Sequence, residues 1–186
     1  MPIKSRGEVV KAIMYHYVRE YDESYPNFRF LNIENFKKQL DFFENKYGFV
    51  KKKDWESFIN NKFVEGSNGK IILTFDDAMK CHYDYVFPEL EKRGLWGIFY
   101  VPTLPYINNK ILDVHRIHLL TGTFDGRDLY SELLGLINYE MMPKSIRDDF
   151  KTRYGNQDNY HGVTEFKKIL NYYIDDKYKK LIIDQI

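Results

Sequence analysis

The stretch Lys70–Leu90, KIILTFDDAMKCHYDYVFPEL, carries the clearest fold signal in this 186-residue sequence. Its apolar start predicts a buried strand over Lys70–Phe75, and the carboxylates of Asp76 and Asp77 follow that strand directly. The next segment, YDYVFPELEKRG, is typical of a helix that ends at Gly94. A helix N-cap would explain one aspartate but not two, so we interpret the pair as functional.

Strands and helices alternate on both sides of this stretch. Apolar and β-branched residues predict two further strands, over Val9–Tyr15 and Gly97–Val101. Between the first two strands, the sequence predicts a helix that stops at Gly48, a short strand, and a second helix capped by Asp54. This alternation is typical of an α/β fold, in which we expect the three main strands to be parallel neighbours in one sheet.

The second half of the sequence is different in character. Apolar residues recur there at helical spacing, and no segment predicts a strand. The residues on the predicted apolar faces are Leu129, Leu133, Leu134, Ile137, Phe166, Ile169, Leu170 and Tyr173. We therefore expect an α/β part over residues 1–109 and a helical insertion or tail over residues 110–186, packed on the same domain.

Composition excludes several classes of protein. With 28 basic and 27 acidic side chains, the sequence offers no electrostatic basis for binding nucleic acid. Cys81 is the single cysteine, which excludes an internal disulfide and fits a reducing compartment. No apolar run approaches the roughly 18 residues of a membrane span, and no signal peptide is recognisable. A cytoplasmic location is therefore expected.

The aspartate pair lies where parallel α/β folds gather functional groups, at the carboxyl end of a strand. Adjacent strand residues point in opposite directions, so we expect different roles for Asp76 and Asp77. One can hold a divalent cation, which keeps both carboxylates ionised, while the other accepts a proton. His16 ends the first strand and either faces the same mouth or is an ordinary core histidine.

Three segments in order resemble a known family. LTFDDA is similar to the first motif of the polysaccharide deacetylases (carbohydrate esterase family four), MYHYV to the N-terminal strand motif of one branch, and FPELEKRGLWGIFYVPT to its next helix and strand. The resemblance implies a distorted barrel of parallel strands and removal of acetyl groups from N-acetylated sugars of a polysaccharide or glycan precursor. Such an enzyme is a hydrolase of C–N bonds other than peptide bonds.

The resemblance also implies roles for individual residues. Asp76 matches the general base that activates water, and Asp77 matches a ligand of a divalent metal, usually zinc. His16, Tyr100 and His115 are further candidates for residues that line the site.

The sequence departs from the family in two ways. Ala78 stands where the family has glycine, and the His-x-x-x-His motif that supplies two further metal ligands is absent from these 186 residues. His115 and His118 share one helix face, as ligands or as part of an ordinary amphipathic helix. KKLIIDQI carries no helix stop signal, so we expect the natural chain to continue past Ile186 into the missing motif.

Two readings from other classes stand beside the enzyme. One is a non-catalytic carbohydrate-binding or interaction module derived from the same fold. The other is a receiver domain, but this class needs a carboxylate at the end of the following strand, and WGIFYVPT has none. A sheet of three or four parallel strands leaves an open edge, so we expect this chain by itself to be only marginally stable or to self-associate through that edge.

Overall fold

The computed structural model describes residues 10–60, 68–141 and 162–186, which form two compact units. With the same gaps, the first unit holds residues 10–21 and 30–103, and the second holds residues 22–29 and 104–186. The observed division thus falls after Thr103. The predicted boundary at residue 109, between a deacetylase-like part and an inserted or appended helical part, stays a prediction.

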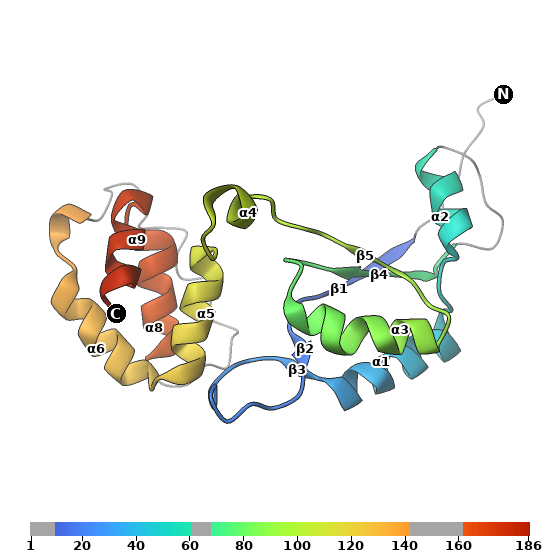
Figure 1. Cartoon of the computed structure of the whole chain (residues 1–186), viewed down its shortest axis with the longest axis horizontal. Coiled ribbons are helices and arrows are strands. Elements are labelled where there is room, and N and C mark those ends of the chain that lie inside the picture. Colours follow the sequence, from blue (N-terminus) through green and yellow to red (C-terminus); the bar gives the residue numbers. More distant parts are fainter. Residues whose placement is uncertain (1–9, 61–67, 142–161) are drawn as a thin grey trace. The chain divides into compact units, whose positions relative to one another are not determined.

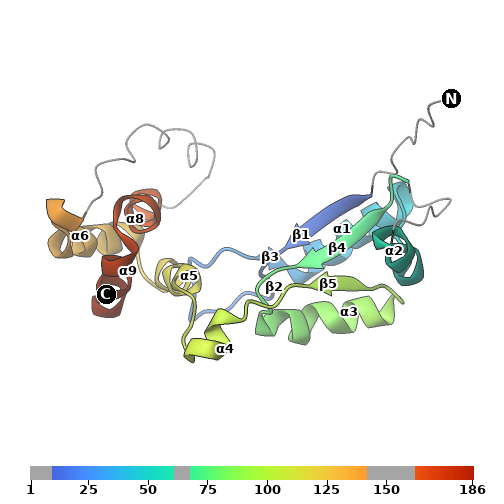
Figure 2. The ribbon, with the colours of Figure 1, turned by 90° about the horizontal axis from the view of Figure 1, so that it is seen from above.

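The first unit is built on a three-stranded parallel sheet in the order β1-β4-β5 (Figures 1 and 2). The strands are β1 (Lys11–Tyr15), β4 (Ile71–Phe75) and β5 (Gly97–Phe99). This confirms the predicted parallel neighbours, except that Val9 lies outside the described residues. Every residue of β4 is buried, as expected of a central parallel strand. Among the described residues, β1 pairs only with β4, and the predicted self-association through an open edge stays a prediction.

One face of the sheet carries the core of the first unit. Ile71, Leu73 and Phe75 of β4 pack against α1 (Ile33–Lys46) and the helical segment formed by η1 (His82–Val86) and α3 (Phe87–Lys92). Figure 1 shows α1 and α3 side by side. Because successive strand residues face opposite sides, one alternate set of β4 side chains supplies this apolar surface.

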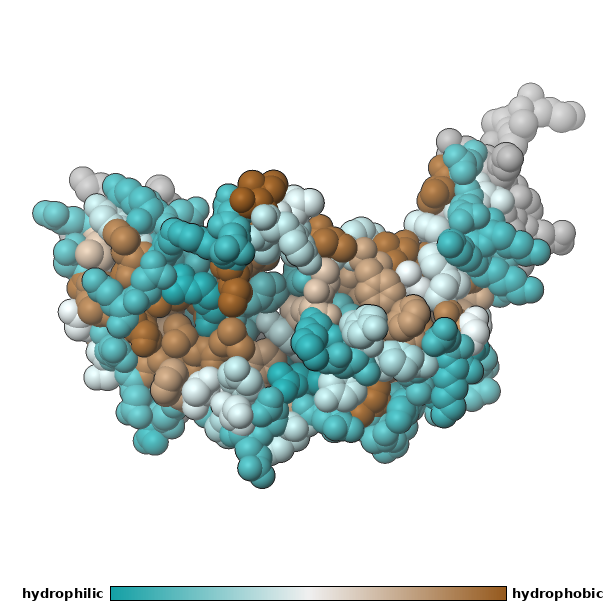
Figure 3. Space-filling view, in the orientation of Figure 1, coloured by the Kyte–Doolittle hydropathy of each residue, from teal (hydrophilic) through white to brown (hydrophobic). Residues whose placement is uncertain are grey.

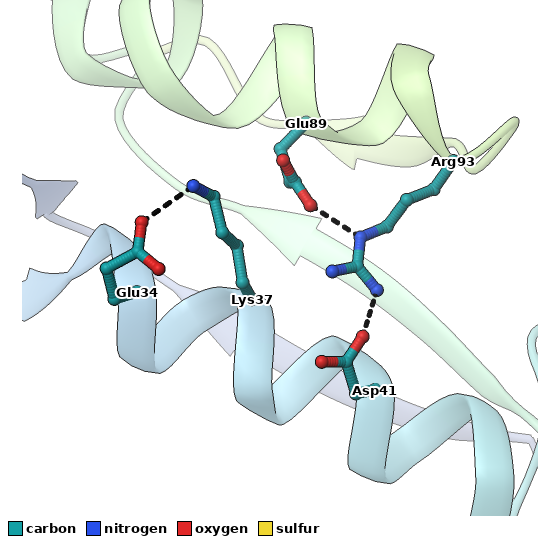
Figure 4. Close-up of polar contacts among 5 residues, drawn as sticks. All are labelled: Glu34, Lys37, Asp41, Glu89 and Arg93. Atoms are coloured by element: carbon teal, nitrogen blue, oxygen red, sulfur yellow. Dashed lines mark hydrogen bonds and ion pairs between the residues drawn. The ribbon is translucent and has the colours of Figure 1, made fainter.

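Polar contacts join the same two helices (Figure 4). The guanidinium of Arg93 donates to Glu89 on its own helix at 2.6 Å and to Asp41 on α1 at 2.5 Å. The Glu89 side chain is only 8% exposed, so Arg93 compensates a carboxylate that is largely removed from water. Lys37 and Glu34, by contrast, form an exposed pair within α1.

The two helices before β4 begin and end close to the predicted positions. Asn32 caps α1, and Gly48, with φ 71°, follows its end as predicted. The prediction that Asp54 caps the next helix was wrong, because α2 (Lys52–Ile59) begins two residues earlier. Asp54 lies in the first turn, where its charge favours the positive end of the helix dipole.

Short elements complete the first unit. β2 (Val18–Arg19) and β3 (Leu31–Asn32) form a small parallel pair of their own. Phe49 makes an isolated parallel bridge to Ile71, at the place where the sequence predicted a short strand.

The second unit contains helices and connecting loops, and no strand among its described residues. Its elements are α4 (Leu104–Asn108), α5 (Asp113–Thr123), α6 (Gly126–Leu136), η2 (Tyr139–Met141), α8 (Val163–Lys168), η3 (Ile169–Tyr173) and α9 (Asp176–Gln185). The predicted absence of strands after residue 112 is confirmed for the described part of that range, so the fold class is α/β with a parallel sheet followed by helices. In the ranges described, no helix has the length and apolar character needed to cross a bilayer.

The second unit has its own core, centred on Leu129, Leu133, Phe166 and Leu170. Leu134 was predicted to join this face but is 49% exposed, because its position on α6 lies well off the stripe of Leu129 and Leu133. The core confirms the other helical periodicities.

Residues Asp22–Arg29 belong to the helical unit, although the first unit surrounds them in sequence. The backbone N–H of Asn27 donates to the carbonyl of Gly122 at 2.9 Å, and the Phe28 ring packs on the same glycine. A Cβ at position 122 would lie only 2.5 Å from that ring, so this contact requires glycine.

Candidate active site

The aspartate pair lies at the carboxyl end of the central strand, as predicted. The backbone N–H of Asp76 donates to the carbonyl of Tyr15 at 2.9 Å and so extends the β1–β4 ladder by one residue. The chain then turns sharply, since Asp77 (φ 74°) and Ala78 (φ 47°) both adopt left-handed backbone conformations. Two consecutive non-glycine residues in this region store strain, which is common at functional sites.

This turn changes the direction of the second carboxylate. Strand alternation predicted that Asp76 and Asp77 point apart, but both Oδ2 atoms lie within 3.9 Å of the same atom, Nε2 of His16. The prediction fails because Asp77 has already left the strand conformation. The left-handed turn brings its side chain back toward the mouth that Asp76 faces.

His16 follows β1 as Asp76 follows β4, so the parallel strands bring their ends together. Its Nε2 lies 3.9 Å from Asp76 Oδ2 and 3.8 Å from Asp77 Oδ2, which confirms the predicted proximity. Both distances are too long for direct hydrogen bonds. The three side chains are 27% to 43% exposed and therefore accessible from solvent.

His82 contacts the backbone of His16 and so helps to hold this cluster in place, a role that sequence analysis missed. Its Nε2 lies 2.5 Å from the backbone carbonyl oxygen of His16, and its ring packs against Phe75 and Phe99. Burial lowers the pKa of His82, so the ring is neutral at pH 7, and its Nε2–H donates to that carbonyl. Its Nδ1 is buried, and the described residues offer it no hydrogen-bond partner. No local pattern marks His82, because its contact spans 66 residues.

Tyr17 is a second residue that sequence analysis did not single out. Burial, followed by the negative charge of Asp77, raises the pKa of its phenol. Tyr17 therefore keeps its proton at neutral pH. Its phenol is close enough to the Asp77 carboxylate for the two groups to interact electrostatically. The sequence signal was its position one residue after His16, at the end of the first strand.

The remaining candidates are less closely tied to the cluster. Tyr100 follows β5, and its backbone N–H donates to the carbonyl of Phe75, which places it level with Asp76 on the neighbouring strand. Its side chain is 54% exposed. His115 and His118 lie on α5 in the second unit, with ring centroids 6.3 Å apart. A role for either histidine in this site stays a prediction.

The donor atoms of the cluster suit a divalent metal, but their spacing is wide. Carboxylate oxygens and imidazole nitrogen are ligands that zinc uses. Around an ion with tetrahedral bonds of 2.0–2.1 Å, neighbouring ligand atoms are about 3.4 Å apart. The 3.8 and 3.9 Å observed here exceed this value, and no group of three or more His, Cys, Asp or Glu side chains in the described ranges is arranged to hold an ion. The chemistry of the donors fits a metal, while a complete ligand set needs further groups.

Comparisons with known proteins found similarity only among solved structures. No protein-family model and no curated protein matches the chain. IcaB from Ammonifex degensii matches with 26% sequence identity over 51% of this chain and 39% of its own, with a TM-score of 0.41. The deacetylase PplD of Streptococcus pyogenes matches with 19% identity, 61% and 52% coverage, and a TM-score of 0.41. A de-N-acetylase from Aggregatibacter actinomycetemcomitans matches with 19% identity, 69% and 52% coverage, and a TM-score of 0.42.

The chain thus spans 39% to 52% of the length of these structures. A likeness at this level concerns part of a fold and assigns no role to any residue. The resemblance to polysaccharide deacetylases therefore rests on the sequence motifs around the aspartate pair.

Proposed function

We propose that this chain carries part of the active site of a metal-dependent deacetylase that acts on N-acetylated sugars of a polysaccharide or glycan precursor. The observation that supports the proposal is the convergence of Asp76, Asp77 and His16 at the carboxyl ends of two parallel strands. Two carboxylates and an imidazole, accessible to solvent and held by a strained turn, suit proton transfer beside a cation.

In the proposed reaction, water adds to the carbonyl carbon of the N-acetyl group and the C–N bond breaks, which yields acetate and the free amine of the sugar. Asp76 accepts the proton of the attacking water, and this proton ends on the leaving nitrogen. Asp77 supplies one anionic ligand to a divalent ion, which we propose to be zinc. When bound, such an ion would acidify the water and polarise the carbonyl.

The neighbouring residues keep these carboxylates in position. His82 holds the end of β1 through the His16 carbonyl, so the His16 ring stays at the mouth. Tyr17 keeps its phenolic proton beside Asp77, because burial and then the Asp77 charge raise its pKa. Since the His-x-x-x-His motif is absent from these 186 residues, we expect this chain by itself to bind zinc weakly and to release no measurable acetate.

The test measures acetate release from N-acetylglucosamine oligosaccharides, with this chain and with a longer form that includes such a motif. In the active form, Asp76→Asn should lower the rate roughly a hundredfold or more while metal stays bound, because general-base assistance is lost. Asp77→Asn should instead lower metal content, with partial rescue by added zinc. Asp84→Asn is the matched control, since Asp84 pairs with Lys80 on the exposed helix surface.

Particular results would contradict the proposal. Equal loss of rate and metal in both site variants would reject the separate roles of Asp76 and Asp77. Robust acetate release by the 186-residue chain would show that its own residues, such as His16 or His115, complete the ligand set.

The alternative of a non-catalytic carbohydrate-binding module has one observation in its favour. The Tyr100 ring is 54% exposed at the same end of the sheet, where an aromatic face is available to stack on a sugar. Metal-independent binding of N-acetylglucosamine oligosaccharides, measured by calorimetry and lost in Tyr100→Ala, would favour this module over the enzyme.

A further inference from the structure

A separate cavity lies in the second unit, between α4, the start of α5 and the C-terminal half of α9. Its volume is about 480 Å³, which is within the range of small-molecule sites. Leu104, Ile111 and Leu112 contribute apolar walls. Figure 3 shows hydrophobic side chains exposed over α4, where Leu104 is 54% and Ile107 is 74% exposed.

The acidic groups of this cavity are already compensated. Arg116 donates to Asp184 at 2.5 Å and to Asp113 at 3.3 Å, so one guanidinium links the two carboxylates across α5 and α9. Arg116 itself is only 24% exposed. This group of three forms a fixed part of the cavity wall.

Two lysines on the same wall, unlike these carboxylates, have no oppositely charged partner among the described residues. Lys110 and Lys180 both line this cavity, and the proximity of Lys180 is the chief reason that the pKa of Lys110 is lowered. Neither ammonium forms an ion pair within the part of the chain that the structure describes, whereas the nearby Lys177 and Lys179 of α9 pair with Asp175 and Asp176. Two like charges in contact repel each other unless a counterion lies between them.

The start of α5 adds to the positive character of the same wall. Leu112 occupies the N-cap position and offers no side-chain hydrogen bond to the first turn. The N-terminal end of this 11-residue helix therefore brings a partial positive charge to the cavity wall, beside the Asp113 carboxylate of its first turn, which pairs with Arg116.

We propose that this cavity binds a small phosphorylated molecule, with its phosphate between Lys110 and Lys180. Charge decides between the candidate anions: a phosphate monoester carries about −1.5 to −2 at pH 7 and compensates both ammonium groups, while a carboxylate compensates one. The cavity is larger than a single phosphate needs, and the apolar walls at Leu104 and Ile111 provide contact area for the body of the ligand. The site is independent of the proposed deacetylase chemistry.

The test uses the 186-residue chain at constant ionic strength, with inorganic phosphate, glucose 6-phosphate and acetate as probes in calorimetric titrations. Glucose 6-phosphate should bind with saturation and more tightly than inorganic phosphate, and acetate should bind most weakly. Lys110→Gln and Lys180→Gln should each weaken glucose 6-phosphate binding about tenfold or more, because each removes a charge-assisted contact. Lys177→Gln, on the same helix but paired with Asp175, should leave it unchanged.

Thermal unfolding provides a second readout that separates binding from folding. Without phosphate, Lys180→Gln should raise the melting temperature, since it removes a repulsion, and it should abolish the increase that glucose 6-phosphate produces in the parent chain. Binding that does not saturate, or that weakens equally in Lys177→Gln, would overturn the site. Binding of inorganic phosphate without glucose 6-phosphate would overturn the proposed class of ligand.

Discussion

The two units of this chain use charged side chains in opposite ways. In the first unit, parallel strands bring two carboxylates and a histidine to one open mouth, and a strained turn fixes the second carboxylate. In the second unit, a cavity beside α4, α5 and α9 has carboxylates that pair with Arg116 and two lysines that form no ion pair with any described residue. These opposite charges are the basis of the two proposals, which are deacetylation at the strand ends and binding of a phosphorylated ligand in the helical unit.

This comparison rests on each unit having its own core, which the largest predicted effect tests. Phe75 is fully buried and stacks on Tyr15 and Phe99, and Phe166 is fully buried in the helical core. Replacement of either by alanine should cost about 3–5 kcal/mol. Hydrogen exchange should show lost protection only in the unit that carries the substitution. Loss of protection across both units in both variants would show one cooperative fold instead.

A smaller effect distinguishes the buried charge in the first unit from its exposed ones (Figure 4). Arg93→Met leaves the buried Glu89 carboxylate without its partner and should lower the free energy of unfolding by about 2–3 kcal/mol in urea titrations. Lys37→Met, which removes an exposed pair with Glu34, should change it by less than about 1 kcal/mol. Equal effects would mean that the Arg93 contacts are no stronger than surface pairs.

The strained turn at the aspartates predicts a gain in stability. Ala78 has φ 47°, so Ala78→Gly should relieve steric strain and raise the free energy of unfolding by about 1 kcal/mol. Ala12→Gly, within β1, is the control and should lower it by about 0.5–1 kcal/mol, because glycine is unfavourable in a strand. Destabilisation by both glycines would contradict the strain at position 78.

The smallest effect concerns pH. The pKa of His82 is lowered by burial, so the unfolded chain binds a proton more readily than the folded chain. The stability from this residue is fully present above the unfolded pKa of about 6.5 and falls as the pH drops below it toward the lowered value. His82→Gln keeps a side-chain N–H for the His16 carbonyl and cannot titrate, so this part of the pH dependence should vanish. Urea midpoints between pH about 8 and 5 measure it, and an unchanged slope in the variant would assign it to other groups.

The sequence was sufficient to predict the strands, their parallel order and the location of the candidate site. Lys70–Phe75 is continuously apolar, the connections on either side are long enough for crossovers, and parallel strands necessarily bring their carboxyl ends to one edge. Those patterns are local or follow from chain connectivity. For that reason the proximity of His16 to Asp76 or Asp77 was predictable before any distance was known, and the structure places it near both.

Only the tertiary structure decided which way each group points and what supports it. The left-handed turn redirects Asp77, His82 reaches a carbonyl 66 residues away, and Lys110, between α4 and α5, lies near Lys180 of α9. Backbone torsions outside the common regions and contacts between distant segments leave no periodic trace in a sequence. They arise when the packed core fixes segments against one another, and they determine which charges are compensated and which remain available to a ligand.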